Sequence, residues 1–150
     1  MTAHRFPRAA QRGFTLIELM ATVSIAGVLS SVALPSFEGV LHKARRSDAL
    51  IATAQVQLAQ EAFRGQSSAY GSLADIRVPA RSPAGHYTLE VSATSATGYT
   101  AVATAVGPQA RDAACRVLKL TSSGLSVERA SGPDASVAND ATTNRRCWSL

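Results

Sequence analysis

Glu18 is the only ionisable side chain in an apolar run of 21 residues from Phe14 to Leu34. A carboxylate inside an apolar helix costs a few kcal/mol, so it needs a partner and a functional reason. Cleavage of the chain between Gly13 and Phe14 would supply that partner, because it creates an α-amino group four residues from Glu18. The two charges could then neutralise each other within one subunit or between neighbouring subunits of a helix bundle.

Cys115 and Cys147 are the two cysteines of the chain. Without a CxxC spacing or a nearby histidine pattern they make a poor metal site. In an exported protein we expect them to form one disulfide, whereas in a cytosolic protein they would remain two unpaired thiols. A bond across this loop would stabilise the fold by ~3 to 4 kcal/mol and would hold the C-terminal tail.

Arg145, Arg146 and Trp148 lie together in the sequence beside the second cysteine. Arginines next to an aromatic ring can hold phosphates and stack bases, so DNA is one candidate ligand of this cluster, with Arg129 and Arg116 as neighbours. The interpretation that we favour is that Trp148 packs against a sheet while the arginines are solvated.

The other residues that could do chemistry are scattered. The three histidines are isolated in the sequence, with no cysteine close enough to suggest a metal site, and the serines lack the G-x-S-x-G pattern of a nucleophile elbow. The aspartates of the second half are expected to solvate loops: Asp75, Asp112, Asp134 and Asp140. We therefore predict no enzyme, no cofactor and no metal site.

The apolar run is long enough to cross a bilayer, since 21 helical residues measure about 31 Å and the hydrocarbon core is roughly 30 Å thick. The basic residues Arg5, Arg8 and Arg12 precede it and would stay cytoplasmic, which places the remainder on the far side of the membrane. Without residues 1–13 the chain has 12 basic and 10 acidic residues, a balance that predicts no polyanion partner by itself.

Two simpler interpretations of the N-terminus compete with processing at Gly13. An ordinary secretory signal peptide could be cut near Ser31-Val32-Ala33, and the whole apolar run would then be lost. A plain single-span anchor would leave Glu18 as an unexplained cost. The position of Glu18 near the start of the run, and the length of the run, disfavour the signal peptide, and the cost of Glu18 disfavours the plain anchor.

At residues 12–19 the chain reads RGFTLIEL, which resembles the class III signal of type IV prepilins and pseudopilins. The resemblance implies that residues 1–13 are a basic leader. A prepilin peptidase would cut between Gly13 and Phe14 and methylate the new amino group of Phe14. It also implies that Glu18 guides assembly by pairing with the N-terminus of a neighbouring subunit.

Residues 14–35 would then form a transmembrane or filament-core helix, and residues 36–64 the amphipathic half of the same long, bent helix, which Gly65 ends. Gly27 and Pro35 lie where related helices are often weakened, and both lower helix stability locally; close helix packing is the alternative for Gly27. The apolar residues of the second half recur at helical spacing: Leu41, Ala44, Ile51, Ala54 and Leu58. The charged residues are expected mostly on other faces: Lys43, Arg45, Arg46 and Asp48.

Residues 65–150 are expected to form a globular head. A connecting αβ-loop, pinned by scattered apolar residues, precedes strands near residues 86–91, 98–106, 115–121 and 125–127, with Ser123-Gly124 as a tight turn. Residues 128–144 are nearly free of large apolar side chains, so their order should depend mainly on the disulfide. The predicted fold class is α+β, with a long bent N-terminal helix on a three- to four-stranded antiparallel sheet. The resemblance adds that this is the pilin ladle fold with a disulfide-closed C-terminal loop.

Weaker matches across the head, such as Tyr87-Thr88-Leu89 and Gly98-Tyr99, resemble minor pilins. They imply a structural subunit of a type IV pilus, which serves motility, adhesion or DNA uptake. The implied location is the inner membrane, with a single span and a periplasmic head, followed by the extracellular pilus. The implied partners are the prepilin peptidase, other major and minor pilins, the inner-membrane assembly platform, and lipid before assembly. The alternatives are a DNA-binding uptake receptor or a type II secretion pseudopilin.

Overall fold

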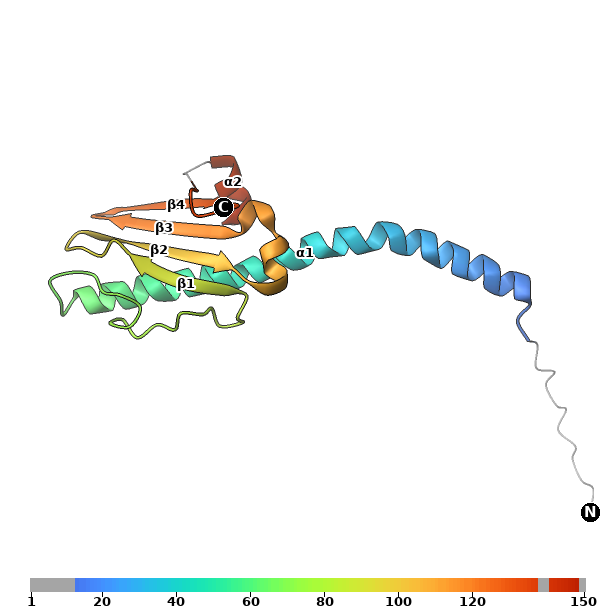
Figure 1. The fold of residues 1–150 in the computed structure, drawn as a ribbon, viewed down its shortest axis with the longest axis horizontal. Helices are drawn as coiled ribbons and strands as arrows, with labels where there is room; N and C mark the ends of the chain where they lie inside the picture. Colours follow the sequence, from blue (N-terminus) through green and yellow to red (C-terminus); the bar gives the residue numbers. More distant parts are fainter. Residues whose placement is uncertain (1–12, 138–140, 149–150) are drawn as a thin grey trace, which may run out of the picture. The chain divides into compact units, whose positions relative to one another are not determined.

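The computed structural model describes residues 13–137 and 141–148, and at residues 33–36 it describes the helical backbone without the side chains. The chain divides into two compact units, Met1–Glu38 and Gly39–Leu150. Helix α1 (Leu16–Arg64) contributes to both units (Figure 1). The predicted leader up to residue 12, the side chain of Pro35, and Asp140 lie outside the described residues.

In the first unit, the side chains of α1 that precede residue 33 are exposed and mostly apolar. Within the described part of the chain, no single helix is both long and apolar enough to count as a membrane span on its own. The segments Leu16–Val32 and Phe37–Arg64, separated by a short break, pass that test only as a pair.

The second unit contains a four-stranded antiparallel sheet in the order β1-β2-β3-β4 (Figure 1). Its strands are β1 (Tyr87–Ser92), β2 (Gly98–Ala105), β3 (Val117–Ser123) and β4 (Ser126–Gly132). Each strand pairs with the next one along the chain. Gly124 turns β3 into β4 with φ of 60°, as the Ser123-Gly124 pair predicts. The predicted α+β class, with a helix and an antiparallel sheet, is confirmed.

The core of the head lies between one face of α1 and the inner face of the sheet. Ala49, Ala52 and Val56 supply the helix side, and their small size lets the helix approach the strands closely. On the sheet side, Tyr87 and Leu89 of β1 are buried. The alternating residues of β2 are buried with them: Tyr99, Ala101, Ala103 and Ala105. Such alternation is typical of strands that bury one face, and both strands lie where the sequence predicted them.

The apolar stripe predicted for α1 is on the opposite side from the core, so that prediction was wrong about the buried face. Ile51 is 52% exposed and Leu58 is 73% exposed, whereas Arg46 and Asp48 are buried. The helix therefore has two apolar faces, and the face with the smaller residues packs on the sheet. The larger residues remain exposed.

The αβ-loop between α1 and β1 is held by both apolar and polar contacts. Ile76 is buried, and Tyr70, Leu73 and Val78 pack against the core, as predicted. The fully buried amide of Gln60 adds two hydrogen bonds: its Nε2 donates to the carbonyl of Gly71, and its Oε1 accepts from the amide of the same residue. A buried amide that satisfies both a donor and an acceptor of one residue fixes the loop in place.

The C-terminal part of the head is more regular than the sequence predicted. Two 3-10 helices, η1 (Gly107–Arg111) and η2 (Ala113–Cys115), precede β3, and a short helix α2 (Ala141–Cys147) follows β4. β4 extends to Gly132, well beyond the predicted residue 127, because it pairs with β3 along its whole length. The expectation that residues 128–144 depend mainly on the disulfide for order was therefore wrong for β4.

Candidate functional site

The start of α1 is a reciprocal cap between Thr15 and Glu18. The amide of Glu18 donates to Oγ1 of Thr15, while the amide and the hydroxyl of Thr15 donate to Oε2 of Glu18, each at 3.3 Å. This is the capping box, in which two side chains satisfy amides that the first helical turn leaves unpaired. The carboxylate thus lies at the positive end of the helix dipole, next to the predicted new N-terminus.

The helix that follows presents an apolar surface, and three of its hydroxyl groups bond back to the helix. The hydroxyls of Thr22, Ser24 and Ser31 each donate to a helix carbonyl three or four residues earlier. Such back-bonding removes the need for water at these positions. A Cβ atom added at Gly27 would meet no atom within 4 Å, so among the described residues no close contact requires a glycine there.

In the second unit, a buried ion pair links α1 to the segment between η1 and η2. Arg46 donates from Nε to Oδ2 of Asp112 at 2.6 Å and from Nη2 to Oδ1 at 2.9 Å. Its Nη1 donates to the main-chain carbonyl of Arg146 at 3.2 Å. The expectation that Asp112 is a solvent-exposed loop residue was therefore wrong, because its carboxylate is buried and paired with Arg46.

The side chain of Gln109 extends this polar network. Its Nε2 donates to the carbonyl of His42, to the hydroxyl of Tyr87 and to Asp112, and its Oε1 lies 3.0 Å from Nδ1 of His42. Burial raises the pKa of Tyr87 to about 12, so its hydroxyl stays neutral and accepts this bond at physiological pH. Helix α1, strand β1 and η1 are thereby fixed to one another at one end of the head.

The predicted disulfide between Cys115 and Cys147 is present, and both residues are fully buried. It joins the end of η2 to the end of α2. Asn144 adds a second attachment, because its Oδ1 accepts from the hydroxyl of Ser131 and its Nδ2 donates to the carbonyl of Arg129. Helix α2 is therefore held on β4 by polar contacts as well as by the covalent bond.

Only part of the predicted basic and aromatic cluster is accessible. Arg145 and Arg146 are exposed on α2. Trp148 is only 6% exposed; it packs in the core, and its Nε1 donates to the carbonyl of Ala130. The guanidinium of Arg129 lies 5.7 Å from the Trp148 ring centroid, at cation–π distance. This agrees with the favoured interpretation, in which Trp148 packs and the two arginines are solvated.

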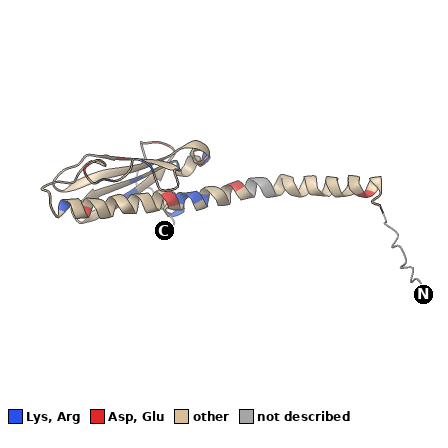
Figure 2. Cartoon of the chain, turned by 90° about the horizontal axis from the view of Figure 1, so that it is seen from below, with Lys and Arg blue, Asp and Glu red and all other residues tan. Residues whose placement is uncertain are grey.

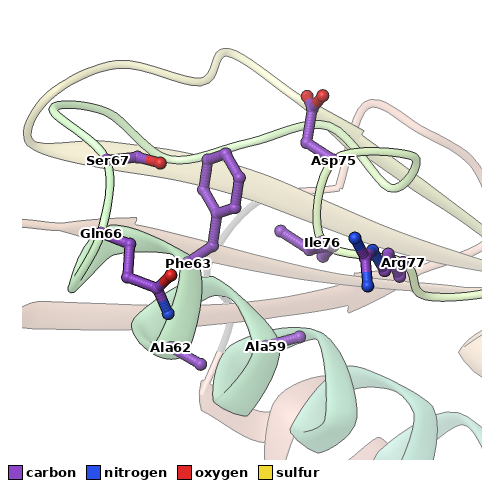
Figure 3. A pocket seen from close by; sticks show the side chains of 8 residues that line it. All are labelled: Ala59, Ala62, Phe63, Gln66, Ser67, Asp75, Ile76 and Arg77. Carbon is purple, nitrogen blue, oxygen red and sulfur yellow. The ribbon is translucent and has the colours of Figure 1, made fainter.

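An open hollow of about 620 Å³ lies between the end of α1 and the αβ-loop (Figure 3). Phe63 extends from the helix toward the loop, and Asp75 and Arg77 belong to the loop. Hydrogen bonds from the hydroxyl and the amide of Ser72 to the Asp75 carboxylate lower its pKa. The Asp75 carboxylate therefore stabilises the αβ-loop itself. The described part of the chain has no group of three or more His, Cys, Asp or Glu that could hold a metal.

Two family comparisons cover most of the chain. Residues 8–34 match the prokaryotic N-terminal methylation motif. Residues 35–119 match the family described as type IV minor pilin ComP, DNA uptake sequence receptor. The chain belongs to this family of type IV minor pilins. The match favours a minor pilin over a secretion pseudopilin, and it implies membrane anchoring, processing at the N-terminus and association with other pilins.

Curated relatives are pilins and fimbrial proteins. The type IV major pilin protein PilA of Myxococcus xanthus is 37% identical over 50% of this chain and 34% of its own length. The fimbrial protein of Moraxella nonliquefaciens is 48% identical over 27% of this chain and 26% of its own. PilE1, a type IV major pilin protein of Neisseria gonorrhoeae, is 46% identical over 27% and 25%. The chain thus matches about a third or less of the length of each relative.

The sequence indicated the processing residues and the cysteines but not the buried polar network. Arg46 and Asp112 are 66 positions apart, so no local pattern in the sequence pairs them. The available signal was the position of Arg46 and Asp48 within a helix that was expected to pack on a sheet. Charged residues so close to the small residues Ala49 and Ala52 have little room to reach solvent.

Proposed function

We propose that this chain is a minor pilin precursor whose apolar N-terminal helix anchors it in the inner membrane, with the head in the periplasm, and later enters a type IV filament. The arginines of the leader support this orientation. The observation that carries the proposal is the exposure of the apolar run, in which side chains such as Phe14 and Ile17 are about four-fifths exposed. A surface of this size requires lipid or other helices around it.

The second apolar face of α1 supports packing against other subunits. Ile51 and Leu58 are exposed on the helix, and Leu58 borders a hollow of about 380 Å³ together with Tyr99 and Val127. In a lone head these side chains would contact water. In a filament they would be buried against neighbouring pilins, which accounts for an apolar stripe that the head itself does not use.

The start of α1 supports the proposed processing by the prepilin peptidase. Gly13 is exposed, and a Cβ atom there would meet no atom within 4 Å, so the Gly13–Phe14 bond has free surroundings within the described chain. Once cut, the methylated amino group of Phe14 adjoins Thr15, whose hydroxyl and amide are bonded to Glu18. In the filament, the amino group of a neighbouring subunit would compete for the same carboxylate, and the assembly platform would bring the two together. The role is structural and involves no catalytic step by this chain.

The test of this proposal is the mature N-terminus. Intact mass and N-terminal sequencing of the protein from its native host membrane should show a chain that begins with N-methylated Phe14. The same measurement in a strain without the prepilin peptidase should show the uncut precursor. A chain that begins near Leu34 would instead indicate an ordinary signal peptide, and an uncut chain in both strains would indicate a plain anchor.

DNA binding is a second candidate function, because the matching family is described as a DNA uptake sequence receptor. The exposed arginines Arg145 and Arg146 on α2 support it, since phosphate contacts by arginine dominate DNA affinity. The double variant Arg145→Gln/Arg146→Gln should bind duplex DNA more weakly, and the slope of log K against log salt should fall by about 1.8 for two lost phosphate contacts. Filaments should still form.

Two control variants sharpen the DNA test. Arg77→Gln/Arg81→Gln removes the same charge from exposed positions of the αβ-loop and should bind DNA as the wild type does. Trp148→Phe should also retain DNA binding, because the ring is buried and does not stack on a base. Equal losses in the two arginine pairs would indicate a response to net charge and would argue against a receptor surface on α2.

A further inference from the structure

Unpaired cations gather at the end of the head where the chain enters it from the first unit. Figure 2 shows Lys and Arg on the turns of α1 that begin the second unit. One 3-10 helix and α2 add further cations at the same end. Together they form what we call the basic end: Lys43, Arg45, Arg111, Arg145 and Arg146. Arg45 is half-buried, the other four are exposed, and among the described residues no hydrogen bond or ion pair engages their side chains.

The buried network shows that these cations share one end of the head. The bonds of Arg46 to Asp112 and to the carbonyl of Arg146 bring the turn of α1 that carries Lys43 and Arg45 beside η1 and α2. Asp112, the carboxylate that this network brings to the same end, is already paired with Arg46. The charge that this end presents to solvent is therefore positive.

The sequence places the basic end close to the apolar run. Lys43 lies nine positions after Leu34, which is roughly 14 Å of helix at a rise of 1.5 Å per residue. The polar layer of a bilayer adds about 5 to 7 Å on each side of its hydrocarbon core, and charges act over a Debye length of about 8 Å beyond it. A membrane-held subunit thus keeps this end within electrostatic reach of the headgroups.

We propose that the basic end binds anionic phospholipid headgroups while the subunit waits in the membrane. This inference rests on the membrane insertion proposed above. Attraction of a cluster of Lys and Arg to an anionic surface needs no shaped pocket, because each cation contributes through the surface potential. The contact holds the head against the bilayer and ends when the apolar run leaves the lipid for the filament.

Trp148 provides a built-in reporter, because it is the only tryptophan of the chain and it lies directly after α2. The processed full-length chain is reconstituted into vesicles that contain dansyl-labelled headgroups and no nucleic acid. We expect energy transfer from Trp148 to dansyl to be higher in vesicles with phosphatidylglycerol than in pure phosphatidylcholine. The difference should vanish when the salt is raised from about 0.1 M to about 1 M, which shortens the Debye length from about 10 Å to about 3 Å.

Matched variants test which cations are responsible. Arg145→Gln/Arg146→Gln should lose about two fifths of the increase caused by phosphatidylglycerol, since it removes two of five cations that contribute similarly. Lys43→Gln/Arg111→Gln should behave in the same way and serves as the second test if the first variant does not fold. Arg77→Gln/Arg81→Gln should retain the full increase. Folding is checked by the closed disulfide and by unchanged Trp148 emission without dansyl.

The outcomes separate this inference from the proposed function. If carbonate extracts the chain from the vesicles, membrane anchoring itself fails. If the chain resists extraction but transfer is equal in both lipids, or if the control pair reduces it as much as the α2 pair, the lipid contact is wrong and the anchoring stands.

Discussion

Arg46 and Asp112 form a two-pronged ion pair that is almost completely buried, with N–O distances of 2.6 and 2.9 Å. Removing one partner from such a pair leaves an uncompensated charge in the interior, which typically costs 3 to 5 kcal/mol, roughly half the stability of a small domain. The pair therefore matters more for what its loss would do than for any net gain that it provides.

We expect Arg46→Met to lower the free energy of unfolding by about 3 to 5 kcal/mol, because Asp112 is left buried and charged. Denaturation of the full chain in detergent, followed by Trp148 fluorescence, measures the loss. The double variant Arg46→Met/Asp112→Leu should recover much of it, because no buried charge remains. If the double variant is no more stable than the single one, packing of the arginine stem matters more than its charge.

Glu18→Ala should yield a processed, membrane-held protein that enters filaments at least about tenfold less often, since a pairing worth about 1.4 kcal/mol is lost. Quantitative immunoblotting of sheared filaments against membranes gives the ratio. Thr15→Ala is the matched control, because it removes the hydroxyl half of the capping box and retains the carboxylate. If Thr15→Ala fails to assemble to the same extent, the helix cap and not the charge is what assembly requires.

The carboxylate of Asp48 should make the head sensitive to acid. Burial acts to raise its pKa, but hydrogen bonds from Ser82 and from the amides of Ala84 and His86 outweigh burial and hold the pKa below 3.8. Because the folded-state pKa lies below the unfolded one, the stabilisation is complete above about pH 4 and is lost as the pH falls through the folded value.

Asp48→Asn should therefore cost about 1 to 2 kcal/mol near neutral pH and should flatten the loss of stability below pH 4. Unfolding free energies measured from about pH 2 to pH 7 test both parts. Glu90→Gln, at an exposed position of β1, should change neither the neutral-pH stability nor the acid slope by a comparable amount. A wild-type slope that Asp48→Asn leaves unchanged would assign acid sensitivity to other carboxylates.

Cys147→Ser should lower the free energy of unfolding by about 2 to 5 kcal/mol while cleavage after Gly13 continues. Cys115→Ser should do the same, and the double variant should be no worse than either single one, because all three lack the same bond. Thermal unfolding and the N-terminal mass report the two effects. Unchanged thermal stability would show that Asn144 and the pairing of β4 suffice to hold α2.

The sequence predicted those parts of the fold whose signals are local. Gly65 follows the last residue of α1, and the alternation of Tyr99 and Ala101 against Thr100 marks β2. The C-terminal part was not predictable in this way. β4 buries the small residues Ala130 and Ser131, so it carries no apolar alternation, and its order comes from pairing with β3 and from cover by α2.

The choice of the buried face of α1 failed for a related reason. Leu58 and Ile51 are larger than Ala49 and Ala52, and a hydrophobicity pattern assigns the larger residues to the core. The face that packs on the sheet instead carries Ala49, Ala52 and Val56, and the bulk of the core comes from sheet residues such as Tyr87. Steric complementarity between two elements is not visible in either one alone, and the same holds for the pairing of Arg46 with Asp112.

The disulfide between Cys115 and Cys147 also depends on how far the export of each copy of the chain has proceeded. Because Cys147 follows every strand of the sheet, the bond cannot close in an exported chain until the last strand has crossed the membrane and met an oxidising environment. In such a chain, a closed disulfide shows that the whole sheet has been exported. A copy that still carries the free thiols lacks the covalent attachment of α2, although Trp148 can still pack in the core, and so it can be told apart from a finished subunit by any step that contacts the head.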